Sequence, residues 1–301
     1  MGLLSLLARV RRARDPTART IGKGAAGMPT IELVRQSRVS AESAWLLKHA
    51  SNQTSQFGED GILAQVFSTI GAQNKWCVEA GAWDGKYLSN THTLMREGWK
   101  GVFIEANAAK FPALQATYAG NDSAHLLREV IGLEPDTGLD SILARTTIPE
   151  TFDLLSLDID GVDYYVWEEL KRYRPRVVAI EFNPTVPNDV IFIQDRASTI
   201  NQGCSLLALV RLGKRKGYEL IAATACNAIF VIGEEFAKFR IPDNGIDAMY
   251  DPVYSARIFQ GYDGTIFTAG MPKLLWVERE ISFEDMQVLP PEKRRYGDAP
   301  V

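Results

Sequence analysis

The sequence predicts an α/β protein built on a mostly parallel β-sheet. Short apolar segments that end on an acidic residue occur four times along the chain, and helical segments separate them. This alternation is typical of a parallel sheet with helices on both faces. Near-continuous apolar strands agree with it, because parallel strands are buried on both faces. The terminal acids should therefore meet at the carboxyl edge of the sheet: Glu79, Glu105, Asp158 and Glu181.

The first strand runs into a glycine-rich turn. Residues 76–78 suit a buried strand that ends on Glu79, and Gly81 and Gly85 bracket a sharp loop before a helical segment at 88–96. A strand, a glycine turn and a helix place backbone N–H groups where open α/β folds bind nucleotides. The Glu-x-Gly-x-x-x-Gly spacing differs from the dinucleotide fingerprint. The acid within this motif would repel a phosphate and suits an ammonium group. A ligand with an amino acid at one end and a nucleoside at the other fits this chemistry, and S-adenosylmethionine is the common one.

The second strand, residues 101–104, ends on Glu105. This acid follows the glycine turn by about twenty residues, the distance at which related folds place a ribose-binding carboxylate. A carboxylate can accept hydrogen bonds from both ribose hydroxyls. The sequence favours ribose binding over the alternative, a solvated residue at a strand end.

Two further strands carry a larger group of acids. Residues 154–157 precede Asp158, Asp160 and Asp163, and residues 177–180 precede Glu181 and Asn183. Oxygen ligands that converge from two adjacent strand ends suit Mg²⁺, which would also offset the repulsion between the acids. In the alternative, Asp160 and Asp163 cap the next helix, and Asp158 alone faces the methyl group.

The last part of the predicted sheet is a hairpin. A helix at 206–216 stops at Gly217 and leads to strands at 218–222 and 228–232. The five residues between them are too few for a parallel crossover, so the two strands should be antiparallel.

These motifs resemble class I S-adenosylmethionine-dependent methyltransferases, and among them the FkbM-type family. The resemblance covers residues from about 52 to about 233. It implies a Rossmann-like fold with five parallel strands, a sixth, and an antiparallel seventh inserted beside it. It also implies O-methylation of sugars or natural products. The matching segments are 55–60, 78–85, 104–105, 157–163 and 180–183.

The candidate site residues follow from these motifs. Catalytic candidates are Asp158, Asp160 and His92. Cofactor-binding candidates are Gln56, Glu79, Gly81, Gly85, Ser89, Glu105 and Asp158. Metal-ligand candidates are Asp158, Asp160, Glu181 and Asn183. Two of these residues keep a structural alternative: His92 as part of its helix, and Gln56 as a cap, with Glu59 and Asp60, of the helix at 62–70.

Composition and the two ends of the chain complete the prediction. A net charge of -4 and a pI near 5.6 argue against nucleic-acid binding, and three scattered cysteines favour a reducing cytoplasm. Residues 1–27 form a basic leader, either disordered or, through 1–22, an amphipathic helix at the inner membrane surface. A methyltransferase domain spans 28–233. Residues 234–301 form an aromatic-rich extension, either a lid or a homo-oligomer contact.

Two functions remain open from the sequence. The first is an S-adenosylmethionine-dependent O-methyltransferase that acts on a hydroxyl of a saccharide or glycosylated small molecule, with or without Mg²⁺. The second is a non-catalytic scaffold in a glycan-assembly system. The complete set of Glu79, Gly81, Gly85 and Glu105 favours the enzyme, because a scaffold has no need of all four.

Overall fold

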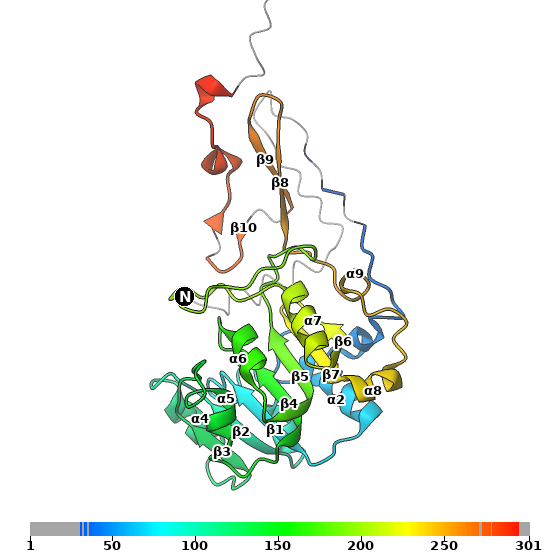
Figure 1. Cartoon of the computed structure of the whole chain (residues 1–301), viewed down its shortest axis with the longest axis vertical. Helices are drawn as coiled ribbons and strands as arrows, with labels where there is room; N and C mark the ends of the chain where they lie inside the picture. The colour runs from blue at the N-terminus through cyan, green and yellow to red at the C-terminus, as the bar shows by residue number, and fades with distance from the viewer. Residues whose placement is uncertain (1–30, 32, 35, 271–272, 278, 295–301) are drawn as a thin grey trace, which may run out of the picture. The chain divides into compact units, whose positions relative to one another are not determined.

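A seven-stranded sheet with the order β3-β2-β1-β4-β5-β7-β6 forms the core of residues 38–251 (Figure 1). The first five strands are parallel, and β7 is antiparallel to both β5 and β6. This confirms the predicted Rossmann-like class I methyltransferase fold, including the antiparallel seventh strand. The strands are β1 Trp76–Ala80, β2 Lys100–Ile104, β3 Ala124–Leu127, β4 Thr151–Leu157, β5 Arg174–Glu181, β6 Tyr218–Ala223 and β7 Asn227–Ile232.

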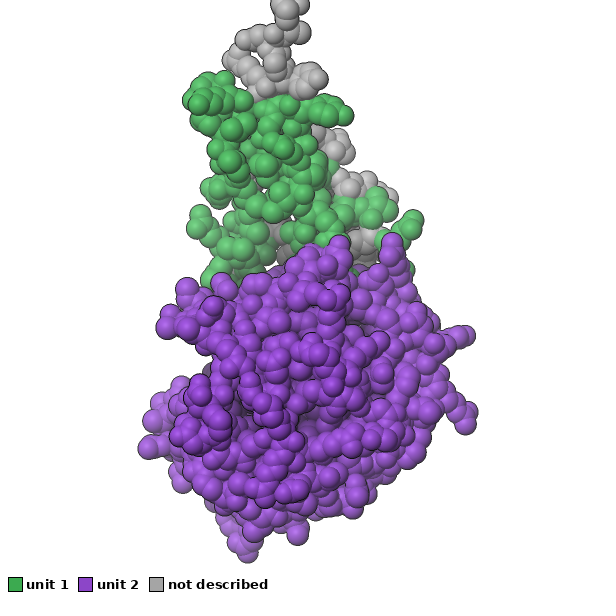
Figure 2. Space-filling model, viewed as in Figure 1, with its two compact units in different colours: residues 1–37, 252–301 green, residues 38–251 purple. Residues whose placement is uncertain are grey.

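This computed structural model describes residues 31, 33–34, 36–270, 273–277 and 279–294. The chain divides into two compact units, residues 38–251 and residues 1–37 with 252–301 (Figure 2). The expected boundary at residue 233 thus falls inside the larger unit, and the expected leader at 1–27 lies outside the described residues. In the part of the chain described, no helix is long and apolar enough to cross a membrane.

Helices surround the sheet of the larger unit. The row α5, α6 and α7 is contiguous, and α2 packs against η2. Strands β4 and β5 form the middle of the core, where Leu154, Leu155, Val177 and Val178 are fully buried. The helices are η2 Trp45–His49, α2 Glu59–Ile70, α3 His92–Arg96, α4 Phe111–Thr117, α5 Leu139–Leu143, α6 Asp163–Glu169, α7 Leu206–Arg215, α8 Gly233–Phe236, η3 Ala237–Phe239 and α9 Ile246–Met249.

The smaller unit contains short antiparallel pairs. Its larger pair is a hairpin in which Phe259 stacks on Phe267 at 5.5 Å between ring centroids. Whether this aromatic-rich segment serves as a lid or as a subunit contact stays a prediction. The elements are β8 Ala256–Gln260, β9 Ile266–Gly270, β10 Lys273–Leu274, β11 Arg279–Glu280, η4 Phe283–Met286 and η5 Pro291–Lys293.

The helix after the glycine turn begins later than the sequence indicates. The predicted helix covers 88–96, whereas α3 starts at His92 and Leu88 has a left-handed φ of 57°. The cause lies in Ser89, Asn90 and Thr91, each of which donates a hydrogen bond to the carboxylate of Glu79. These bonds compete with helix formation, as short polar side chains commonly do.

Strand β3 is not identified by the residue pattern. It is four residues long and lies at the edge of the sheet. His125 belongs to β3 and is half-buried. Its ring stacks on Trp76 with centroids 5.6 Å apart. Short strands without alternation give little periodic signal.

Candidate active site

The candidate site lies at the carboxyl edge of the sheet, where the strand order reverses between β1 and β4. Such a switch point is where open α/β sheets bind ligands. Gly81 follows β1 with a φ of 83°, and a Cβ at this position would lie 1.7 Å from the carbonyl oxygen of Asp158. Glycine is therefore required for the chain to leave β1 this close to the end of β4.

Gly85 has an independent reason to be glycine. Its φ is 74°, and a Cβ there would lie 2.6 Å from atoms of Leu114 and Tyr118, so that the loop could not rest on α4. The hydroxyl of Tyr118 donates to the Gly85 carbonyl at 2.9 Å. Both glycines of the motif thus shape the loop through contacts with the protein itself, and their contact with a cofactor stays a prediction.

Glu79 holds the later part of the same loop through hydrogen bonds. Its buried carboxylate accepts hydrogen bonds from Ser89 Oγ and Thr91 Oγ1, both at 2.8 Å, and from the Asn90 N–H at 2.9 Å. Burial raises the pKa of Glu79 to about 7, although these hydrogen bonds act in the opposite direction. A carboxylate has about four acceptor positions, and three of those on Glu79 hold the loop. The predicted contacts of Glu79 and Ser89 with a cofactor must be compatible with this arrangement.

Glu105 follows β2 and connects two backbone segments. One carboxylate oxygen accepts from the Trp83 N–H at 2.7 Å, and the other accepts from the Asn107 N–H at 2.6 Å. Each oxygen keeps a second lone pair that a ribose hydroxyl can use. The Trp83 ring is 42% exposed, and the ammonium of Lys110 lies 4.0 Å from its centroid.

Asp158, Asp160 and Glu181 come together as the sequence predicts for adjacent strand ends. One carboxylate oxygen from each lies within 4.8 Å of the other two. Burial, followed by the negative charges of Asp163 and Asp160, raises the pKa of Asp158 to about 8. Burial and the charge of Asp158 raise the pKa of Glu181 well above its ordinary value.

A hydrogen bond joins the two carboxyl groups of Asp158 and Glu181, and it lowers the pKa of Asp158 while it raises that of Glu181. The two carboxyl groups are therefore expected to share one proton between them. Two acids in this arrangement titrate as a pair, because the second ionisation must overcome the charge left by the first. We call Asp158 and Glu181 the carboxyl pair.

Asp163 and Asp160 have different positions in the loop after β4. The buried carboxylate of Asp163 accepts from the N–H groups of Ile159 and Gly161, both at 2.8 Å, and so closes the loop. Asp163 is the first residue of α6, whose N-cap is Val162. Asp160 is exposed, with a left-handed φ of 61°. Neither acid caps α6 from the N-cap position.

Asn183, a predicted metal ligand, uses its amide elsewhere. Its Oδ1 accepts from the N–H and the hydroxyl of Thr185, at 3.0 and 2.7 Å, and its Nδ2 donates to the Gln202 carbonyl at 3.0 Å. A metal would have to compete with Thr185 for this oxygen.

His92 has its contacts around the glycine loop. Its Nδ1 lies 3.5 Å from the hydroxyl of Tyr118, and burial lowers the pKa of its imidazole. A hydrogen bond with the Gly85 backbone acts in the opposite direction on this pKa. The role of His92 as a base stays a prediction.

The segment before α2 contacts the turn between β6 and β7. Half-buried Gln56 lies with its Oε1 3.7 Å from the Sγ of Cys226, in the turn between β6 and β7. Asp60 accepts from the N–H groups of Gln53, Thr54 and Ser55, so it folds the chain that precedes α2. Sequence reasoning missed the contact between Gln56 and Cys226, because 170 residues separate them in the chain.

Comparisons with known proteins found similar chains among solved structures. No protein-family model and no curated protein sequence matches the chain. Among solved structures, the chain is similar to the N-terminal domain of EvdMO1 with S-adenosylhomocysteine bound, at 13% identity and a TM-score of 0.40, over 60% of this chain and 81% of that one. It is also similar to an S-adenosylmethionine-dependent methyltransferase from Aquifex aeolicus, at 14% identity and a TM-score of 0.37, over 58% and 89%.

A third similar structure is monomeric WbdD, at 16% identity and a TM-score of 0.37, over 58% of this chain. The chain spans only 40% of the length of WbdD. All of these similarities are remote, so the fold assignment rests on the strand order of the sheet itself.

Proposed function

We propose that this protein is an S-adenosylmethionine-dependent methyltransferase that methylates a hydroxyl group. One observation carries the proposal. At the switch point of a class I methyltransferase sheet, a glycine loop lies between two strand-terminal acids, and one of them, Glu105, keeps acceptor capacity on both oxygens. This set of acceptors fits a nucleoside that carries an amino acid.

The residues at the switch point would hold this cofactor in a defined direction. Glu105 would accept the ribose hydroxyls with its remaining lone pairs. The loop at 81–91, held by Glu79, would bind the amino-acid end, and Asp158 would lie toward the methyl group. When bound, S-adenosylmethionine supplies a methyl group on a positively charged sulfonium sulfur.

The carboxyl pair supplies a position for the acceptor's proton. When S-adenosylmethionine supplies its methyl group, the acceptor oxygen would have to lose its proton. The hydroxyl proton passes to a carboxylate oxygen of Asp158. The raised pKa makes Asp158, once it is ionised, a stronger base than an ordinary carboxylate.

Divalent-cation assistance is a second form of the same proposal. Three carboxylate oxygens within 4.8 Å, from Asp158, Asp160 and Glu181, offer the hard ligands that Mg²⁺ prefers. A cation there would replace the proton shared by the carboxyl pair and would stabilise an alkoxide. Asn183 would join this set only after release from Thr185.

Cofactor binding is tested by calorimetry with S-adenosylhomocysteine. Glu105→Ala should weaken binding by about 1–3 kcal/mol, the usual effect of removing a charged hydrogen-bond partner. Asp140→Asn is a matched control, because Asp140 also holds a loop by accepting backbone N–H groups, those of Lys171, Arg172 and Tyr173. No binding by the wild-type protein would reject the enzyme and favour the scaffold.

One activity assay distinguishes the two forms of the proposal, Asp158 as the base and a bound divalent cation. Asp158→Asn should lower kcat by about 100-fold or more, with S-adenosylhomocysteine affinity nearly unchanged, because the carboxylate acts in the transition state. If EDTA abolishes turnover and Mg²⁺ restores it, the cation form holds. Turnover that is insensitive to EDTA leaves Asp158 as the base.

The nature of the acceptor and the subfamily are narrower parts of the proposal. A saccharide acceptor and membership of the FkbM-type group rest on the sequence resemblance in segments such as 78–85 and 157–163. A panel of neutral, amino and acidic saccharides, assayed for transfer of a labelled methyl group, tests the acceptor. Methylation of nitrogen in place of oxygen would overturn the assignment to O-methyl transfer.

A further inference from the structure

The segment that precedes α2 contains a buried acid for which the proposed chemistry has no use. Glu59 is the first residue of α2, and its side chain is fully buried. One oxygen, Oε2, accepts from the Phe57 N–H at 2.7 Å. The other, Oε1, accepts from the hydroxyl of Thr224 at 2.6 Å and from the amide Nδ2 of Asn227 at 3.1 Å. A single carboxylate thus joins two segments that lie about 165 residues apart.

The segment that Glu59 holds is the turn between β6 and β7, residues 224–227. Within this turn, the Thr224 N–H donates to the Asn227 carbonyl at 2.8 Å, and the Asn227 N–H donates to the Thr224 hydroxyl at 3.2 Å. Thr224 and Asn227 therefore serve both the turn and Glu59. Loss of the Glu59 carboxylate would leave their buried donors without this partner, which is costly in a protein interior.

The same turn lies against the end of β5, where the carboxyl pair is located. The Cys226 carbonyl accepts from the Phe182 N–H at 2.7 Å, next to Glu181 in the chain. Asn227 lies directly opposite Glu181 in the antiparallel β5–β7 ladder, so their side chains are on the same face of the sheet. Any movement of the turn would therefore reach Glu181 through one strand pair.

We propose that Glu59 is a positioning residue for the carboxyl pair: by holding the β6–β7 turn against the segment of Gln56, it fixes Glu181 relative to Asp158. This inference rests on the proposed function, because it assigns a catalytic consequence to the position of the pair. It also assigns a structural role to each of three residues in the motif at 55–60. Asp60 folds the chain before α2, Glu59 holds the distant turn, and Gln56 lies beside Cys226.

The test compares the pH dependence of kcat in wild-type protein and in Glu59→Gln. Glutamine has one acceptor oxygen, so it cannot serve both the Phe57 N–H and the donors of the turn. We expect kcat to fall about tenfold and the pH profile of kcat to shift, because the distance within the pair sets its titration. The charges that act on Glu181 (Asp158, Asp160 and Asp163) are unchanged by this substitution.

A second readout does not require activity. Cys77, Cys204 and Cys226 are all buried free thiols, and peptide mapping after alkylation distinguishes them. Glu59→Gln should expose Cys226 to the reagent while Cys77 stays protected. Thr224→Val, which removes only one donor to Glu59, should give a smaller change in the same direction. The Glu59→Gln/Thr224→Val double variant should be non-additive, because both changes remove the same hydrogen bond.

Asp140→Asn serves again as the control, since it removes a loop-holding carboxylate far from the turn. A Glu59→Gln protein that is less stable, yet keeps the wild-type pH profile and a protected Cys226, would show that Glu59 is only structural and overturn the proposal. If the wild-type protein has no turnover, the proposed function fails by itself. The protection of Cys226 then still decides whether Glu59 holds the turn.

Discussion

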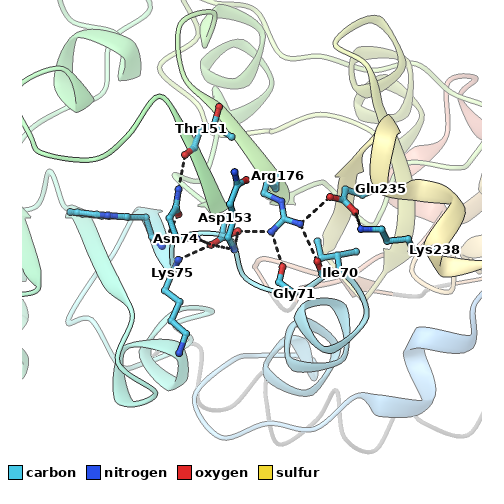
Figure 3. A network of polar contacts seen from close by, with 11 residues as sticks. Ile70, Gly71, Asn74, Lys75, Thr151, Asp153, Arg176, Glu235 and Lys238 are labelled. Carbon is cyan, nitrogen blue, oxygen red and sulfur yellow. Dashed lines mark hydrogen bonds and ion pairs between the residues drawn. The ribbon is translucent and has the colours of Figure 1, made fainter.

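The acids at the two ends of β4 and β5 have opposite kinds of neighbours. At the amino ends, Asp153 on β4 accepts from the guanidinium of Arg176 on β5 at 2.7 Å (Figure 3). The same carboxylate also accepts from the backbone N–H groups of Gln73, Asn74 and Lys75. At the carboxyl ends of the same strands, Asp158 and Glu181 have each other and further acids as their main charged neighbours.

Arg176, the cation of this network at the amino ends, has further hydrogen-bond partners. Arg176 donates to the carbonyls of Ile70 and Gly71 and to Glu235, which in turn pairs with Lys238 (Figure 3). Removing one partner from such a network leaves the other charge buried and uncompensated, which is strongly destabilising. Acids placed side by side without a cation cost stability instead. The comparison indicates that the amino edge of the sheet is structural and that the carboxyl edge is the place to expect chemistry.

The largest effect on stability should come from breaking the ion pair between Asp153 and Arg176. Asp153→Ala leaves Arg176 without its closest charged partner and three N–H groups without an acceptor, so it should destabilise the protein by about 3–5 kcal/mol. Urea unfolding measures this difference. Affinity of the folded variant for S-adenosylhomocysteine should match the wild type. A loss below about 1 kcal/mol would show that the two ends are not energetically different.

An intermediate effect should appear in the pH dependence of stability, through the carboxyl pair at the carboxyl ends of β4 and β5. The pKa of Asp158 rises from 3.8 to about 8 on folding, so the folded state binds this proton more tightly than the unfolded state. Stability should therefore fall as the pH rises between about 4 and 8. Asp158→Asn removes this contribution, so its unfolding free energy should fall less steeply than that of the wild type between pH 5 and pH 8. Parallel curves for the two proteins would contradict the shared-proton arrangement.

The smallest effect should come from an exposed ion pair beside the buried network. Arg174 also lies on β5, but its pair with Glu234 has side chains that are 50% and 62% exposed. Arg174→Gln should change stability by less than about 1 kcal/mol, because solvent screens the pair and the side chains lose freedom on pairing. Arg176→Gln provides the matched buried comparison in the same unfolding assay. Equal losses for the two arginines would mean that burial does not decide the difference.

Local sequence patterns predicted most of the fold. Apolar strands that end on acids, a glycine turn and a link of five residues between two strands were enough to give a mostly parallel sheet with a terminal hairpin. They also placed Glu79, Glu105, Asp158 and Glu181 correctly at one edge, because the carboxyl ends of parallel strands coincide. Strand β3 and the start of α3 escaped prediction, the first for its length and the second because Glu79 captures the residues before His92.

The sequence by itself thus determined which acids meet at the edge of the sheet, since periodicity and strand direction are local properties of the chain. Only the tertiary structure decided how each acid is used. Asp153 forms an ion pair with Arg176, and Asp158 shares a proton with Glu181. Glu59 accepts hydrogen bonds from a turn about 165 residues away in the chain. The physical reason is that a carboxylate's pKa and role depend on the donors and charges within a few ångströms, and those neighbours come from distant parts of the chain.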